Sequence, residues 1–183
     1  MKSRLHTDNH IEGTKVVGFW GMFLKEFYRL LGRTVIGRPP RVLLYRLSGI
    51  RIGKNTQING ALQIMDGRYK GLVEIGSYCA ISPRVSLVPG SAPPFPHPEL
   101  PIESCPIKFA KIVIEDGVWI GTGAVILPGV RIGKHAIIGS NSVVNRNVPP
   151  YAIMFGMPAK RIGWRNIRGK RVYDKEDQTK HNE

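Results

Sequence analysis

One histidine of the chain, His97, is set between two prolines in the stretch FPHPELP, residues 95–101. Pro96 and Pro98 lack a backbone N–H and restrict the backbone, so this stretch cannot belong to a helix interior or a central strand. It is predicted to be a loop with few conformations and an imidazole on it. A neutral imidazole near pH 7 can accept a proton from a hydroxyl or an amine, so His97 is a candidate general base. From this stretch alone, an ordinary surface histidine is the alternative.

The charge of the chain indicates an anionic partner. The formal net charge of the 183 residues is +14 at pH 7, and no acidic residue occurs between Gly117 and Tyr173. Such a surface favours nucleic acid, anionic lipid or a phosphorylated cofactor. The sequence contains no RNP aromatics, no zinc-finger spacing and no basic region followed by heptads, so nucleic acid is not expected as a partner.

The two cysteines, Cys79 and Cys105, are too few for a disulfide framework or a cysteine metal cluster. They fit a reducing compartment, and residues 1–10 carry no hydrophobic run of a signal peptide, so a cytoplasmic location is expected. The repeat region described next offers only His97 and His135 as imidazole ligands, with no close pair. No metal site is therefore expected. This argues against a γ-class carbonic anhydrase, because that class of enzyme needs several zinc-binding histidines.

The strongest pattern is a repeat of six residues. Aliphatic residues recur at this period in three runs: Ile52, Ile58 and Ile64; Ile75, Ile81 and Leu87; and Ile114, Ile120, Ile126, Ile132, Ile138 and Val144. A period of six fits neither an α-helix nor a long alternating strand. It predicts a mainly β protein in which short strands and tight turns stack as a parallel β-helix with the aliphatic residues inside. Three units form one triangular coil, so about four coils are expected.

The period is interrupted twice, by residues 66–72 and by residues 88–111. The interior of a β-helix tolerates no irregular backbone, so the longer interruption must project from an edge as a loop. Loops on a rigid scaffold are where functional residues concentrate. His97 lies in this loop, which favours its role as a base over an ordinary surface histidine.

Two adjoining stretches then suggest a family. VWIGTGAVILPGVRIGKHAIIGSNSVV, followed by VPPYAIMFGMPAKRI, resembles the hexapeptide-repeat acyltransferases, nearest to the maltose, galactoside and capsular or exopolysaccharide O-acetyltransferases. The resemblance covers about residues 50–162 and implies a left-handed β-helix. It also implies a homotrimer with active sites between subunits, acetyl-CoA as cosubstrate and no metal. The expected function is an acetyl-CoA-dependent O-acetyltransferase acting on the hydroxyl of a sugar or polysaccharide precursor, in surface polysaccharide biosynthesis.

The same resemblance assigns roles to individual residues. His97, followed by Pro98 as in the family, is the expected catalytic base for direct transfer. The residues expected to bind acetyl-CoA are Thr122, Ser140, Asn145, Arg146, Lys160 and Arg161, the last two at the phosphates. Where the family often has Thr-Lys, this chain has Asn145-Arg146, which keeps the cation. The residues expected near the acceptor are Asn59, Asp66 and Trp119.

Two other functions are compatible with the same fold. One is N-acetylation of an amino sugar or another small amine, and the other is a non-catalytic β-helix binding module. The binding module would need neither the loop histidine nor the basic groove.

The ends of the chain have a different character. Residues 1–49 form a predicted helical segment, in which Val16–Leu31 and Pro40–Leu47 are amphipathic helices rich in arginine. These helices either cap the β-helix or pack in the trimer, or they make a peripheral contact with the inner face of the membrane. Residues 50–163 form the β-helix domain with its inserted loop. Residues 164–183 are predicted to be a basic extension that ends in a disordered tail.

Overall fold

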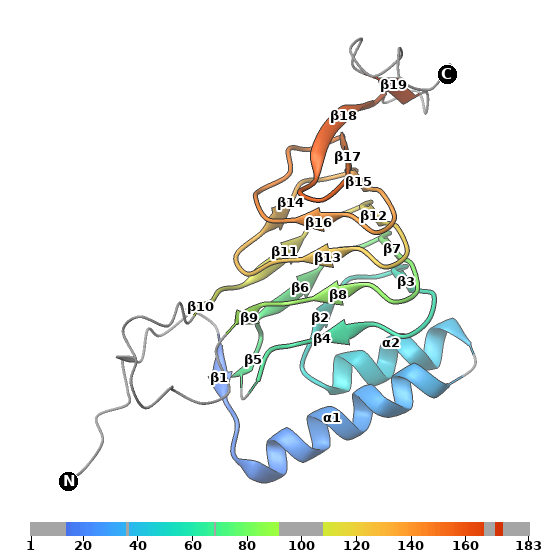
Figure 1. Cartoon of the computed structure of the whole chain (residues 1–183). Helices are drawn as coiled ribbons and strands as arrows, with labels where there is room; N and C mark the ends of the chain where they lie inside the picture. The colour runs from blue at the N-terminus through green and yellow to red at the C-terminus, as the bar shows by residue number, and fades with distance from the viewer. Residues whose placement is uncertain (1–13, 36, 68, 92–107, 167–170, 174–183) are drawn as a thin grey trace, which may run out of the picture.

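The computed structural model describes residues 14–35, 37–67, 69–91, 108–166 and 171–173. Short strands wind upward from two helices, α1 (Phe19–Thr34) and α2 (Arg38–Leu47), which lie across one end of the molecule (Figure 1). The opposite end is formed by the last strands of the chain (Figure 1). The fold is therefore mainly β with helices at its N-terminal end, as predicted.

The chain passes through three sheets in turn, and each circuit adds one strand to each sheet. The first sheet holds β2 (Arg51–Ile52), β6 (Val73–Ile75), β11 (Ile112–Ile114) and β14 (Arg131–Ile132). The second holds β3 (Gln57–Ile58), β7 (Ala80–Ile81), β12 (Trp119–Ile120), β15 (Ile137–Ile138), β17 (Ala152–Phe155), β18 (Lys160–Arg165) and β19 (Arg171–Tyr173). The third holds β4 (Gln63–Ile64), β8 (Ser86–Leu87), β13 (Val125–Ile126) and β16 (Val143–Val144). Up to β17 all neighbours are parallel, so the four predicted coils are confirmed.

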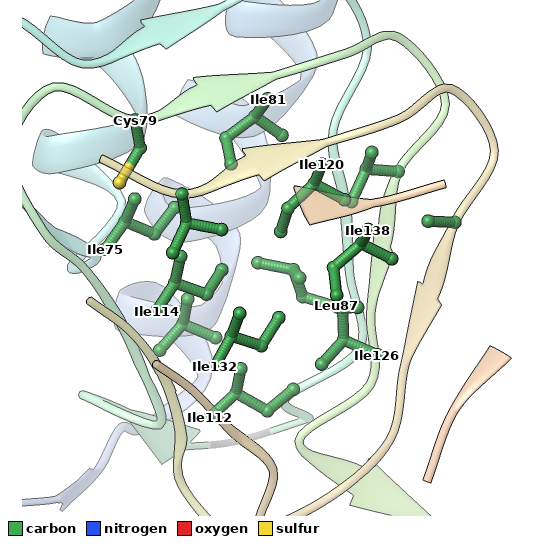
Figure 2. Packing of buried hydrophobic residues seen from close by; sticks show 14 of the residues in the cluster. Ile75, Cys79, Ile81, Leu87, Ile112, Ile114, Ile120, Ile126, Ile132 and Ile138 are labelled. Atoms are coloured by element: carbon green, nitrogen blue, oxygen red, sulfur yellow. The ribbon is translucent and has the colours of Figure 1, made fainter. Parts of the chain in front are cut away.

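The six-residue repeat places one aliphatic side chain of each strand in the interior. Ile75 pairs with Ile114 in the first sheet, and Ile81 with Ile120 in the second. Figure 2 shows these side chains converging on a common core with Leu87 and Ile126 of the third sheet. All of the repeat aliphatic residues are buried, so each coil stacks its apolar residues on those of the next.

The two interruptions of the period leave from the same edge of the β-helix. The short one contains β5 (Tyr69–Lys70), and the long one begins with β9 (Gly90–Ser91) and ends with β10 (Lys108–Phe109), which pair antiparallel. The ring of Phe109 lies 4.8 Å from that of Tyr69, so the two excursions contact each other. The predicted projecting loop thus has a stem held at its base. Residues 92–107 of the loop lie outside the described residues.

The first helix begins and ends three residues later than predicted. Residues Lys15–Val16 form β1, which pairs antiparallel with β5, so they are extended. β-branched valines fit a strand well, and Gly18 is extended before the helix starts at Phe19. The second helix begins at Arg38 instead of Pro40, because proline is well tolerated in the first turn of a helix.

The second helix is attached to the first coil by buried polar contacts. The Tyr45 hydroxyl donates to the Leu62 carbonyl oxygen at 3.1 Å and accepts from the Leu62 N–H at 3.0 Å. Burial raises the pKa of the Tyr45 hydroxyl, which therefore stays neutral. Arg41 donates to the carbonyl oxygens of Gly32, Val35 and Ile58, and so ties both helices to the coil.

The first helix is attached by buried ion pairs. Lys25 Nζ lies 2.8 Å from Asp66 Oδ1, and Arg29 binds both carboxylate oxygens of Asp66, at 2.9 and 2.6 Å. Lys25 also donates to the carbonyl oxygens of Gly67 and Tyr69. The three charged side chains are at most 5% exposed. The short excursion of residues 66–72 therefore provides the anchor of α1.

The last strands of the chain extend the second sheet. β18 runs antiparallel to β17 and continues past residue 163 to Arg165, and β19 pairs with it in turn. The basic extension thus begins inside a strand of the second sheet. Residues 174–183, predicted to be disordered, lie outside the described residues.

The buried anchor of α1 leads to a prediction about stability. Asp66→Asn should lower the free energy of unfolding by about 3–5 kcal/mol, because it leaves two buried cations with only the half-exposed Glu26 as counterion. Glu74→Gln is the matched control, since Glu74 makes partly exposed pairs with Arg51 and Lys111. The control should cost less than about 1 kcal/mol. Urea unfolding followed by circular dichroism measures both, and equal losses would contradict the prediction.

Candidate active site at the corners of the β-helix

The candidate site residues occupy the corners between sheets. The 2–3 corner consists of the turns from the second to the third sheet, residues 59–62, 82–85, 121–124 and 139–142. The 3–1 corner consists of the turns from the third sheet back to the first, residues 65–72, 88–111, 127–130 and 145–147. Since the coils are in register, residues of one corner lie above one another along the β-helix.

Thr122 and Ser140 lie on successive coils of the 2–3 corner. The Asn141 N–H donates to the Thr122 carbonyl oxygen at 2.9 Å, which joins the two turns. A Cβ atom on Gly121 would lie 2.6 Å from the Ser140 backbone nitrogen. The glycine that follows the repeat aliphatic residue is thus required for close stacking of these turns. The structure therefore brings Thr122 and Ser140 together.

Lys160 reaches the same corner from the end of the β-helix. It pairs with Phe155 across β17 and β18, and the Phe155 ring packs so close to Gly139 that a Cβ there would lie 2.1 Å from it. Arg161 follows on β18, and its guanidinium lies 4.6 Å from the centre of the Trp164 ring. Both cations are exposed. A corner with two cations beside polar turns can receive phosphate groups.

Two residues of this corner were not anticipated from the sequence. Phe155 is 52% exposed and Met157 is 73% exposed, although both follow a well-packed repeat. The turn between them and Lys160 is tied to the last coil, because the Ser142 hydroxyl accepts from the Gly156 N–H and Val143 bonds to the backbone of Gly156 and Ala159. In the sequence, the only indication that Phe155 and Met157 belong to this corner was their position directly after the repeats.

Asn145 and Arg146 lie at the 3–1 corner, across the third sheet from Thr122 and Ser140. Both side chains are exposed and directly follow β16. The projecting loop leaves from this same corner two coils below. Within one chain, therefore, the structure does not bring Asn145 and Arg146 together with Thr122 and Ser140.

The residues expected near the acceptor lie in three different settings. Asn59 is in the first coil of the 2–3 corner, below Thr122, and is partly exposed. Trp119 is 44% exposed on the outer face of the second sheet, between Ala80 and Ile137. Asp66 is buried and both of its oxygens bind Lys25 and Arg29, so the expectation that it recognises a substrate hydroxyl is replaced by its role as the anchor of α1.

The described residues offer no reactive thiol and no metal site. Cys79 is buried and its thiol donates to the Glu115 carbonyl oxygen at 3.1 Å. Burial raises the pKa of the Cys79 thiol, which disfavours the nucleophilic thiolate. Among the residues that the structure describes, no group of three His, Cys, Asp or Glu side chains could hold a metal ion. His97 lies outside them, so its catalytic role stays a prediction.

Comparison with known proteins shows the class to which this β-helix belongs. Residues 111–146 match the family model described as bacterial transferase hexapeptide (six repeats). The chain is 35% identical to galactoside O-acetyltransferase of Escherichia coli over 153 residues, which is 84% of this chain and 72% of that protein. It is 39% identical to chloramphenicol acetyltransferase of Klebsiella aerogenes over 48% of this chain and 49% of that protein.

A solved structure extends this similarity to three dimensions. The hexapeptide-repeat acetyltransferase VCA0836 of Vibrio cholerae, in complex with acetyl-CoA, has a TM-score of 0.64 and 27% sequence identity, over 79% of this chain and 87% of that one. The chain belongs to the hexapeptide-repeat acetyltransferase family. The predicted left-handed parallel β-helix and the assignment as an acyltransferase are confirmed.

The close stacking of the 2–3 corner can be tested by one added methyl group. Gly121→Ala should lower the free energy of unfolding by about 1–3 kcal/mol, because the new Cβ meets backbone atoms that cannot move aside. Ser82 occupies the equivalent position one coil below and already carries a Cβ. Ser82→Ala, as the control, should change stability by less than about 0.5 kcal/mol. Thermal unfolding compares the two, and a neutral Gly121→Ala would show that the turns are not closely stacked.

Proposed function

We propose that the protein is an acetyl-CoA-dependent O-acetyltransferase that acetylates a sugar hydroxyl, with surface polysaccharide biosynthesis as its role. The observation that carries this proposal is the similarity to galactoside O-acetyltransferase, which extends over most of both chains. The two named relatives differ in their acceptor, a galactoside in one and chloramphenicol in the other. A panel of sugars, amino sugars and chloramphenicol is therefore the direct assay of the acceptor.

In this proposal acetyl-CoA lies along the 2–3 corner near the last coils. Thr122 and Ser140 line the groove there, and Lys160 and Arg161 bind the phosphates. The acetyl-CoA complex of the Vibrio cholerae relative supports the cosubstrate. The chain is proposed to work in the cytoplasm, a reducing compartment that contains acetyl-CoA.

A homotrimer would complete the site. Within one chain Asn145 and Arg146 lie across the third sheet from Thr122 and Ser140. If the 3–1 corner of one subunit faces the 2–3 corner of its neighbour, both groups line one cleft, and the projecting loop leaves beside it. A closed cyclic assembly repeats this contact three times.

His97 is the proposed general base of a direct transfer. Its imidazole takes the proton of the acceptor hydroxyl while the hydroxyl oxygen attacks the acetyl carbonyl carbon. The carbon–sulfur bond of the thioester then breaks, and the CoA sulfur receives the proton from the imidazolium. Pro96 and Pro98 limit the conformations of the loop before the substrate binds, which reduces the entropy lost on reaching the reactive geometry. Asn59 and Trp119 are the proposed contacts of the acceptor.

The proposed phosphate contacts can be tested by reversing two charges. Lys160→Glu with Arg161→Glu should raise the KM for acetyl-CoA by about tenfold or more and change kcat far less, because these cations would bind substrate and transition state alike. The matched control, Lys54→Glu with Lys134→Glu, reverses two exposed charges at the corner between the first and second sheets. The control should leave KM within about twofold. Steady-state kinetics at two salt concentrations measure both variants. An unchanged KM in the Lys160→Glu, Arg161→Glu variant would exclude these residues as phosphate contacts.

The proposed base can be tested at the loop. His97→Ala should lower kcat by about 10²-fold or more, and it should leave CoA affinity and the trimer unchanged. In the wild type, kcat/KM should fall at acidic pH, because a protonated imidazole, with an ordinary pKa of about 6.5, cannot accept the proton. Cys105→Ser should remain active if transfer is direct. Calorimetry and light scattering provide the controls, and near-wild-type turnover by His97→Ala would remove the histidine from the mechanism.

A further inference from the structure

The first helix carries its apolar residues on the side that faces away from the β-helix. Its exposed large side chains, by exposed fraction, are Phe19 73%, Trp20 74%, Phe23 56%, Leu24 48%, Phe27 45% and Leu30 59%. On a helix these positions fall on one face, about 140° wide. We call these six residues the aromatic face of α1. A surface helix of a globular protein normally turns such a face to the core.

The orientation of α1 is fixed by its opposite side. That side presents Lys25, Arg29 and Gly32, which are the buried residues of the helix. Lys25 and Arg29 bind Asp66, and the Tyr45 ring packs so closely on Gly32 that a Cβ there would lie 3.2 Å from it. Turning the aromatic face inward would break these buried ion pairs at a large cost. The outward position of the aromatic residues is therefore a built feature of the fold.

The aromatic face is continuous along the helix. Ring centres lie 5.9 Å apart for Phe19 and Trp20, 6.3 Å for Trp20 and Phe23, and 6.4 Å for Phe23 and Phe27. Sixteen residues of helix extend for about 24 Å. Leu43 and Leu47 of the neighbouring helix α2 are exposed as well. An exposed apolar surface of this extent indicates a binding partner.

The charges around the aromatic face indicate what that partner is. Residues 14–58 contain one acidic residue, Glu26, and nine basic residues: Lys15, Lys25, Arg29, Arg33, Arg38, Arg41, Arg46, Arg51 and Lys54. Apart from the buried Lys25 and Arg29, exposed cations flank α1 at both ends, with Lys15 before it and Arg33 in its last turn. Phe, Trp and Leu on one face with Lys and Arg around it are typical of helices that lie in the interface of an anionic membrane.

We propose that the aromatic face of α1 docks the protein on the surface of an anionic lipid bilayer. No helix among the described residues is long and apolar enough to cross a membrane, so the helix would lie in the plane of the interface. α1 lies across one end of the β-helix (Figure 1), and its aromatic face is exposed. In a cyclic trimer the three equivalent ends point to the same side, so three helices would bind one flat surface together and gain in avidity. The proposal does not depend on which acceptor the enzyme uses.

Vesicle flotation tests the proposal with the full-length protein. Wild type should float with vesicles of phosphatidylcholine containing about 30% phosphatidylglycerol. The bound fraction should be several-fold smaller with vesicles of phosphatidylcholine alone. Phe23→Ser with Phe27→Ser should reduce the bound fraction at least about tenfold. Tyr78→Asn is the control, because Tyr78 is 60% exposed at a turn far along the chain and has a positive φ that Asn tolerates. Circular dichroism verifies that both variants are folded.

Trp20 gives a second measurement that does not require loss of binding. Lipids brominated on their acyl chains should quench part of the tryptophan emission of wild type. They should quench far less in Trp20→Phe, which keeps an aromatic ring and should still float. Equal quenching in the two proteins would show that another surface meets the lipid.

Two results of the flotation assay would also overturn the proposal. One is the absence of flotation with anionic vesicles, and the other is equal binding by wild type and the Phe23→Ser, Phe27→Ser variant. If wild type does not float and that variant forms a smaller assembly by light scattering, the aromatic face is instead a contact between subunits.

Discussion

The fold depends on one constraint, which is the stacking of successive coils at the spacing of neighbouring β-strands, about 4.8 Å. Each strand contributes one buried aliphatic residue, and each turn must repeat the same path above the last. At Gly76 a Cβ would lie 2.8 Å from backbone atoms of the next coil, and at Gly133 2.5 Å. The interior is therefore filled and regular. Chemistry is confined to outward side chains, to the corners and to the excursions that leave the stack.

This constraint explains which features were predictable from the sequence. The period of six predicts which residues form the core, how many coils there are and where the two interruptions fall. It can do so because a buried residue at every sixth position is a local pattern. The projection of the long loop follows as well, since residues 88–111 can leave only from an edge. The pairing of residues 15 and 16 with β5 was missed, because it depends on a strand that is formed more than fifty residues later.

The candidate site was predictable only in part, for a related reason. Thr122 and Ser140 have equivalent places in successive coils, so their proximity follows from the repeat. Asn145 and Arg146 are close to Ser140 in sequence but lie at a different corner, because a turn and a strand separate them. The role of Asp66 was not visible, since its partners, Lys25 and Arg29, are about forty residues away on a helix. The exposure of Phe155 depends on β17 and β18 turning back at the end of the stack.

Asp66 connects the two functions inferred for the molecule. It belongs to the excursion at the 3–1 corner, directly below the stem of the projecting loop, and it determines which side of α1 faces outward. The helices lie at one end of the β-helix, and β18, which begins at Lys160, lies at the other (Figure 1). A membrane at the helical end would thus leave the proposed acetyl-CoA groove in water. The projecting loop leaves the stack at the second coil, between these two ends.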